Sequence, residues 1–84
     1  MRFYVYLISS KDKKRTISYV GYTNDIKKRI RLHNSSKGAK FTKGRIWKLK
    51  YFKSYNSKNE AMREEYKLKK NYKFRKKLKS DFYK

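Results

Sequence analysis

The sequence contains no cysteine and no proline, and only three glycines and one histidine among its 84 residues. Without cysteine the chain can form neither a disulfide framework nor a cysteine-based zinc site. One histidine is too few for the usual transition-metal clusters. No apolar run approaches the roughly 20 residues of a membrane span, and the N-terminal stretch MRFYVYLISS is too short and too aromatic for a signal peptide. We therefore expect a protein of the cytoplasm.

Acidic residues are scarce as well, since six Asp and Glu stand against 27 Lys and Arg, for a net charge of +21. This charge opposes compaction, yet the aromatic content of 18% and the periodic apolar positions predict one folded domain over residues 1–84. Clustered Lys and Arg are the footprint of phosphate recognition. We expect nucleic acid as the partner and association with the nucleoid; a membrane surface is the weaker alternative.

Three segments predict β-strands. Residues 2–9 are β-branched and aromatic, and they are apolar on both faces from Phe3 to Ile8, which is typical of a central strand. A second strand over 16–22 is expected to end at Gly21, and the short connection between the two predicts an antiparallel hairpin. A third strand is expected over 46–55.

Three further segments predict helices. The first begins at the cluster Thr23–Asp25, where Thr23 or Asn24 can cap and Asp25 favours the dipole, and runs to about His33. The capping box Ser57–Glu60 precedes a long helix over 60–72, and a basic helix follows around 74–82. The order β-β-α-β-α-α predicts an α+β fold, a three-stranded antiparallel sheet flanked by helices.

One acid of the long predicted helix stands out. Ala61, Glu65 and Leu68 share a stripe by helical spacing, so Glu65 is expected to face the sheet or a cleft, whereas Glu64 is expected to be solvated. An inward carboxylate is costly unless it is paired or bound to a metal. Glu65 is therefore either the ion-pair partner of an arginine or a ligand of a divalent metal.

The first predicted helix carries Arg29 and His33 on the same side as Ile26 and Ile30, near the edge of the core. His33 can alternatively be a cation that satisfies the last helix carbonyls, and Arg29 one more basic surface group. Most strand tyrosines are expected to pack in the core with the hydroxyl at the rim.

The ordered set YVY (Tyr4–Tyr6), YVG (Tyr19–Gly21), Arg29, His33 and Glu65 resembles a GIY-YIG nuclease domain. The resemblance covers nearly the whole chain and is strongest to the small stand-alone branch, related to the N-terminal nuclease domain of the repair protein UvrC. Two positions depart from the family pattern. Tyr4 stands where many members have Gly, and Lys77 stands where some branches carry an Asn.

The resemblance implies a metal-dependent DNA phosphodiesterase in which Tyr6, Tyr19, Arg29, His33 and Glu65 take part in catalysis. Glu65 would hold one Mg²⁺ or Mn²⁺, and Arg29 would clamp a phosphate oxygen. Tyr6 is the favoured general base with His33 as its proton acceptor, and nearby cations are expected to favour the phenolate. Tyr19 would touch the incoming phosphate.

Many of the remaining basic residues are expected to contact DNA phosphates and to give little sequence choice. They are Lys27, Lys28, Arg31, Lys37, Lys40, Lys43, Arg45, Lys69, Lys70, Lys73 and Lys77. The predicted function is an endonuclease of low sequence specificity, selective for DNA structure and related to repair. A non-catalytic DNA- or RNA-binding protein of the same fold is the alternative. A requirement for a protein partner and the choice between a monomer and a weak dimer stay open.

Overall fold

A computed structural model describes residues 2–11, 15–38 and 40–80 and has the predicted α+β architecture. In chain order the elements are β1 Phe3–Lys11, β2 Thr16–Thr23, α1 Ile26–Asn34, a short 3-10 helix η1 Lys40–Thr42, β3 Lys48–Tyr55, α2 Lys58–Lys70 and α3 Tyr72–Ser80. The order β-β-α-β-α-α is confirmed, and η1 is added to it.

The sheet has the strand order β2-β1-β3, and both neighbours of β1 run antiparallel to it. The central place of β1 follows from its sequence, because Val5 to Ser10 are all buried and only a strand covered on both faces can place such a run. A bulge on β3 opposite Leu7 and Ile8 makes Lys50 an extra residue. Bulges of this kind increase the local twist of a sheet.

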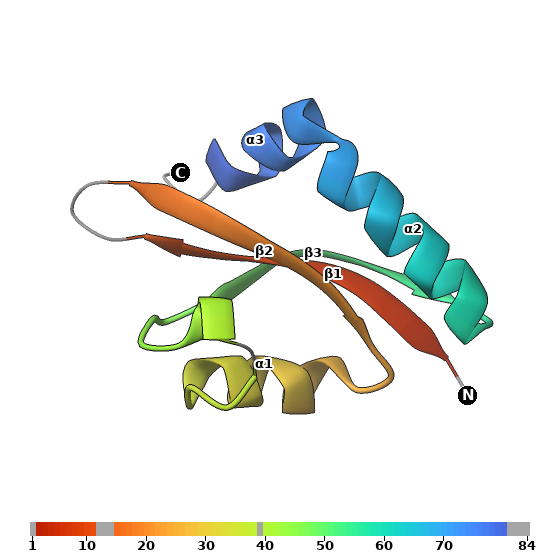
Figure 1. The fold of residues 1–84 in the computed structure, drawn as a ribbon, viewed down its shortest axis with the longest axis horizontal. Coiled ribbons are helices and arrows are strands. Elements are labelled where there is room, and N and C mark those ends of the chain that lie inside the picture. Colours follow the sequence, from red (N-terminus) through yellow and green to blue (C-terminus); the bar gives the residue numbers. More distant parts are fainter. Residues whose placement is uncertain (1, 12–14, 39, 81–84) are drawn as a thin grey trace.

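The helices form a layer on each face of the sheet, with α1 and η1 on one side and α2 and α3 on the other (Figure 1). Two hydrophobic cores result. The core under α2 and α3 is built on Val5, Leu7, Val20, Ala61 and Leu68. The core on the α1 side is built on Tyr6, Ile8 and Trp47, with Ile17, Tyr19 and Ile30 against them. Alternate residues of β1 thus pack into the two cores on opposite faces of the sheet.

Several boundaries of the first half of the chain differ from the predictions. Strand β1 spans Phe3–Lys11 rather than residues 2–9. Strand β2 does not end at Gly21 but continues to Thr23, because Gly21 pairs with Tyr6 inside the ladder. The cap of α1 is Asp25 itself, not Thr23 or Asn24, and its carboxylate accepts from the Lys28 amide at 3.1 Å. An aspartate at this position both satisfies a free amide and favours the helix dipole.

Boundaries of the second half differ too. Helix α2 begins at Lys58 rather than at residue 60, and α3 begins at Tyr72 rather than at residue 74. Strand β3 begins at Lys48 rather than at residue 46, and the long helix stops at Lys70. Asn71 ends α2 and starts α3, since its amide donates to the Leu68 carbonyl and its side-chain oxygen accepts from the Phe74 amide. The basic helix is α3, Tyr72–Ser80; the last two residues of its predicted range, 81 and 82, lie outside the described residues.

Within the described part of the chain, no helix combines the length and apolar character that crossing a bilayer would require.

Candidate active site

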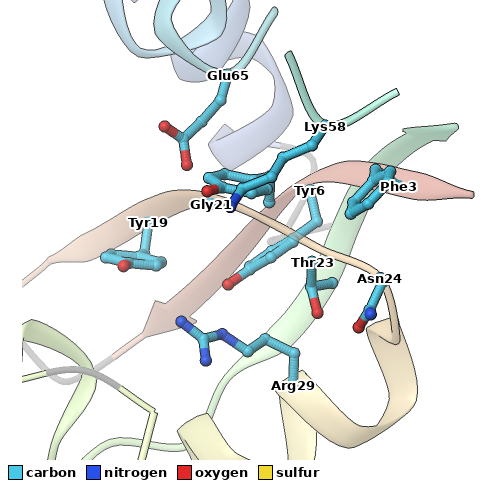
Figure 2. Close-up of a pocket in the computed structure, with 10 residues that line it drawn as sticks. Phe3, Tyr6, Tyr19, Gly21, Thr23, Asn24, Arg29, Lys58 and Glu65 are labelled. Atoms are coloured by element: carbon cyan, nitrogen blue, oxygen red, sulfur yellow. The ribbon is translucent and has the colours of Figure 1, made fainter. Parts of the chain in front are cut away.

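A pocket of about 340 Å³ lies where α1 and α2, from opposite faces of the sheet, meet the edge strand β2 (Figure 2). Four residues predicted from the sequence line it, namely Tyr6, Tyr19, Arg29 and Glu65. The others are Phe3, Gly21, Tyr22, Thr23, Asn24 and Lys58. Figure 2 shows Glu65 reaching down from α2 and Arg29 reaching up from α1, with the two tyrosine hydroxyls between them.

The Tyr6 side chain crosses β2 at Gly21, its partner in the antiparallel ladder. A Cβ atom on Gly21 would lie 2.5 Å from the Tyr6 hydroxyl oxygen and 2.8 Å from Cζ, far inside van der Waals contact. Glycine is required here for space. It lets a residue of the central strand present its hydroxyl in a pocket at the sheet edge.

Behind the pocket, Tyr6 and His33 form a buried hydrogen-bonded chain that ends at Thr42. The Tyr6 hydroxyl lies 2.8 Å from His33 Nε2, and His33 Nδ1 lies 2.9 Å from the Thr42 hydroxyl. All three side chains are at most 1% exposed. A Cβ on Gly38 would lie 2.4 Å from His33 Nδ1, so the backbone at Gly38 packs directly on the imidazole. His33 is thus a fully buried ring held on both nitrogens, not an exposed cation on the helix terminus.

The electrostatics of this pair correct one expectation. Burial raises the pKa of Tyr6 above its usual value, although the Arg29 guanidinium beside it acts in the opposite direction. The phenolate that nearby cations were expected to favour is therefore disfavoured in the protein itself. Burial, and then the positive charge of Arg29, lower the pKa of His33 below its usual 6.5. Both members of the pair are neutral at neutral pH, and Nε2 of His33 can accept the Tyr6 proton when Nδ1–H donates to Thr42.

The lowered pKa of His33 predicts a loss of stability in weak acid. The unfolded chain binds a proton at His33 near pH 6.5, whereas the folded protein resists it until a lower pH, so stability is full above 6.5 and falls as the pH drops below it. The melting temperature should fall between pH 7.5 and 5.5. A His33→Gln variant, which lacks the only histidine of the chain, should lose most of this pH dependence. An equal fall in both proteins would assign it to other groups.

Arg29 supplies the positive charge of the pocket. Its side chain is half-buried, and its buried Nε has no hydrogen-bond partner among the described residues. A buried donor without an acceptor is costly. An anion bound in the pocket would provide the acceptor, and a guanidinium matches the geometry of phosphate oxygens.

Glu65 supplies the negative charge, as the helical stripe of Ala61 and Leu68 predicted, since both of these are buried. Among the described residues its ion pair is with Lys69, one helical turn away at 3.5 Å, and not with an arginine. The Glu65 side chain is 18% exposed and that of Lys69 is 53% exposed. Ion pairs of this kind contribute at most about 1 kcal/mol, so the Glu65 carboxylate can exchange Lys69 for another ligand at little cost.

The donor set around Glu65 fits one kind of metal site only. Among the described residues, no group of three or more His, Asp or Glu could hold a metal ion as a closed cage. A single carboxylate facing an open pocket suits Mg²⁺ or Mn²⁺, which keeps waters and takes phosphate oxygens to complete its shell. Such an ion would be held jointly by Glu65 and by a bound phosphate.

Glu64 is not the solvated acid that the sequence predicted. It is half-buried in a groove between α2 and β3 and pairs with Lys67 at 3.2 Å. The stripe of α2 that faces the sheet is wide enough to include it. Glu64 nevertheless stays outside the pocket that Glu65 lines.

Tyr19 is half-buried and touches two rings. It makes an edge contact with His33 at a centroid distance of 5.1 Å and stacks on Phe41 at 6.0 Å, with 23° between the planes. Lys58, the first residue of α2, is a pocket cation that sequence reasoning missed. The capping box placed it at a helix start, but no local pattern shows that this start adjoins the end of β2.

The eleven basic residues predicted to bind DNA lie in two groups, one in each helical layer. Lys27, Lys28, Arg31, Lys37, Lys40, Lys43 and Arg45 belong to α1, η1 and their loops, and Lys69, Lys70, Lys73 and Lys77 to α2 and α3. All are exposed except Arg45, which is half-buried. The sheet separates the two groups (Figure 1), and the pocket is lined by a residue of each helical layer, Arg29 of α1 and Glu65 of α2.

Comparisons with known proteins agree with the resemblance seen in the sequence. The family model of the GIY-YIG catalytic domain matches residues 2–79. A UPF0213 protein of Oceanobacillus iheyensis is 42% identical over 67 residues, which cover 79% of this chain and 74% of that protein. A UPF0213 protein of Bacillus licheniformis is 46% identical over 68 residues, covering 80% of this chain and 67% of that protein.

A solved structure is similar as well. It is the solution NMR structure of a UPF0213 protein from Bacillus halodurans, 46% identical in sequence, with a TM-score of 0.47. The match covers 82% of this chain and 71% of that one.

Proposed function

The chain belongs to the GIY-YIG catalytic domain family, and from this premise we propose that it is a divalent-metal-dependent endonuclease that hydrolyses phosphodiester bonds in DNA. The observation that carries the proposal is the pocket at the edge of β2. It brings together a cation with a buried unsatisfied donor, a carboxylate on an open cavity and a tyrosine backed by a neutral histidine. These are the groups that hydrolysis of a phosphodiester needs: charge neutralisation, metal binding and proton transfer.

Arg29 would bind a non-bridging oxygen of the scissile phosphate, which gives its buried Nε the acceptor that it lacks. Glu65, on the opposite wall, would hold the Mg²⁺ or Mn²⁺. The ion, when bound, supplies charge neutralisation at the phosphate and at the leaving oxygen. Arg29 and Glu65 come from helices on opposite faces of the sheet, so a phosphate between them would contact Arg29 on one side and the metal ion held by Glu65 on the other.

Tyr6 would pass a proton from the attacking water to His33. The water donates to the Tyr6 oxygen while the Tyr6 hydroxyl proton moves to Nε2 of His33, 2.8 Å away, and Thr42 holds the ring orientation through Nδ1. Burial raises the pKa of Tyr6 and leaves little phenolate before the reaction, so the neutral His33 would be the base and Tyr6 would relay the proton to it. Tyr19, which lines the pocket and whose ring lies against His33, would hydrogen-bond the phosphate.

The exposed basic residues of both layers would bind the DNA backbone and make affinity depend steeply on salt. If six to eight phosphates are neutralised, the slope of log K against log salt should be about −5 to −7 on duplex DNA. Filter binding or fluorescence anisotropy between 50 and 300 mM salt would measure it. A slope near −1 would show that these residues are not the DNA-binding surface.

The proposed activity can be tested by nicking of supercoiled plasmid. Nicked product should form with about 5 mM Mg²⁺ or Mn²⁺ and should be absent with chelator. DNA binding without nicking in either metal would contradict the proposal and favour a non-catalytic nucleic-acid-binding protein. A random distribution of nick positions would agree with phosphate contacts that carry no sequence information.

A further inference from the structure

Phe41, in η1, is a large aromatic side chain that the proposed chemistry leaves without a role. It is 57% exposed, although the next residue, Thr42, is buried and the centroid of the Phe41 ring lies 6.3 Å from that of the buried Trp47. One face of its ring stacks on Tyr19, whose own side chain lines the candidate active site. Phe41 therefore adjoins the pocket through its contact with Tyr19.

Hydrogen bonds tie the segment that carries Phe41 to α1. Asn34, at the end of α1, accepts from the Trp47 amide at 2.6 Å and donates to the Trp47 carbonyl at 3.2 Å. The indole Nε1–H of Trp47 donates to the Thr42 carbonyl at 2.9 Å, and the Thr42 side chain bonds His33. These hydrogen bonds hold the backbone around the exposed Phe41. A ligand that binds there therefore costs little conformational entropy of the segment.

The surroundings of Phe41 favour a polyanion. Lys40 and Lys43 flank it in sequence and Lys37 precedes it, all three with exposed side chains. An aromatic ring among solvated lysines, next to a phosphate-sized pocket with a guanidinium, is the pattern of proteins that bind single-stranded nucleic acid. Lysines contact the backbone while the ring stacks on a base.

We propose that Phe41, backed by Tyr19, is a stacking platform for an unpaired base next to the scissile phosphate, and that the substrate class is DNA with unpaired nucleotides, such as flaps, gaps or frayed ends. This inference rests on the proposed nuclease function. A base inside a duplex has both faces covered by its neighbours, so only a base that has left the stack can lie on Phe41. The platform selects for structure and not for sequence, because every base has a π-face.

The test is a binding assay that needs no cleavage. Phe41→Ala is compared with Phe52→Ala, in which an equally large ring is lost from β3, where Phe52 is 55% exposed and contacts Tyr4. Both changes are made in a Glu65→Gln background, so that the DNA stays intact. Affinity is measured for a flapped duplex and for the same sequence fully paired, with 2-aminopurine at the first unpaired position of the flap.

Phe41→Ala should weaken binding of the flapped DNA by about 5- to 100-fold and leave the paired duplex unaffected. It should also abolish the quenching of 2-aminopurine, and Phe41→Trp should restore both. Phe52→Ala should change neither. Equal losses on paired and unpaired DNA, or full quenching in Phe41→Ala, would overturn the proposal. Because the readout is binding, these outcomes are independent of whether plasmid is nicked.

Discussion

Replacing Glu65 by glutamine is expected to lower metal-dependent cleavage by about 10²- to 10³-fold or more. The reason is that the change removes the carboxylate of the pocket, and a metal ion contributes several kcal/mol of transition-state stabilisation in such reactions. DNA affinity should not weaken, because the change removes a negative charge and releases Lys69 from its ion pair. Single-turnover cleavage and anisotropy on the same DNA would measure the two quantities separately.

Glu64→Gln is the matched control for this variant. It makes the same chemical change one residue away on the same helix, in a carboxylate that faces a different groove and pairs with Lys67. Its cleavage rate should stay close to that of the wild type. Cleavage by Glu65→Gln at the wild-type rate would show that Glu65 is not part of the active site. A loss of DNA affinity in parallel with the loss of rate would show that Glu65 acts in substrate binding instead.

Tyr6→Phe is expected to lower the cleavage rate by about 10²-fold or more, the range for losing a group that transfers a proton. The same change should destabilise the protein, because Nε2 of the buried His33 loses its partner. An unsatisfied buried group costs about 1–3 kcal/mol, and each kcal/mol corresponds to about 4–8 °C in a domain of this size. Thermal melts and cleavage assays well below the melting temperature would measure the two effects.

Tyr19→Phe keeps both ring contacts of Tyr19 and should cost less in rate. The pH dependence separates two mechanisms for Tyr6. With a raised pKa at Tyr6 and a neutral His33, the rate should be level between pH 7 and 9. A tenfold rise per pH unit over this range would show that the phenolate is the reacting form, and a larger loss in Tyr19→Phe than in Tyr6→Phe would exchange the two roles.

Much of the fold could be predicted because the decisive patterns are local. Strand β1 is apolar on both faces, and only the centre of a sheet accommodates that. Ser57 caps α2 at Glu60, as the capping box indicates. The interruption at Asn71 was missed because asparagine is compatible with a helix in local sequence. Whether Asn71 ends α2 and begins α3 depends on where α3 packs in the fold.

The candidate site was predictable only in part. The stripe of Ala61 and Leu68 located Glu65 on the inner side of its helix, and the family resemblance supplied the remaining positions. The state of Tyr6 could not be predicted, because counting nearby cations leaves out burial, which depends on packing between β1, α1 and η1. Thr42 and Lys58 were missed for the same reason, since each reaches the site from a segment distant in sequence.

The crossing of Tyr6 over Gly21 has a consequence for the evolution of the family. Because the tyrosine hydroxyl occupies the space of the missing Cβ, position 21 cannot gain a side chain while Tyr6 is kept. Homologous sequences should therefore show covariation between positions 6 and 21, with side chains at position 21 confined to lineages that have replaced the tyrosine. Gly38 and His33 form a second pair of this kind. Homologues with side chains at both glycine positions should therefore have replaced both Tyr6 and His33.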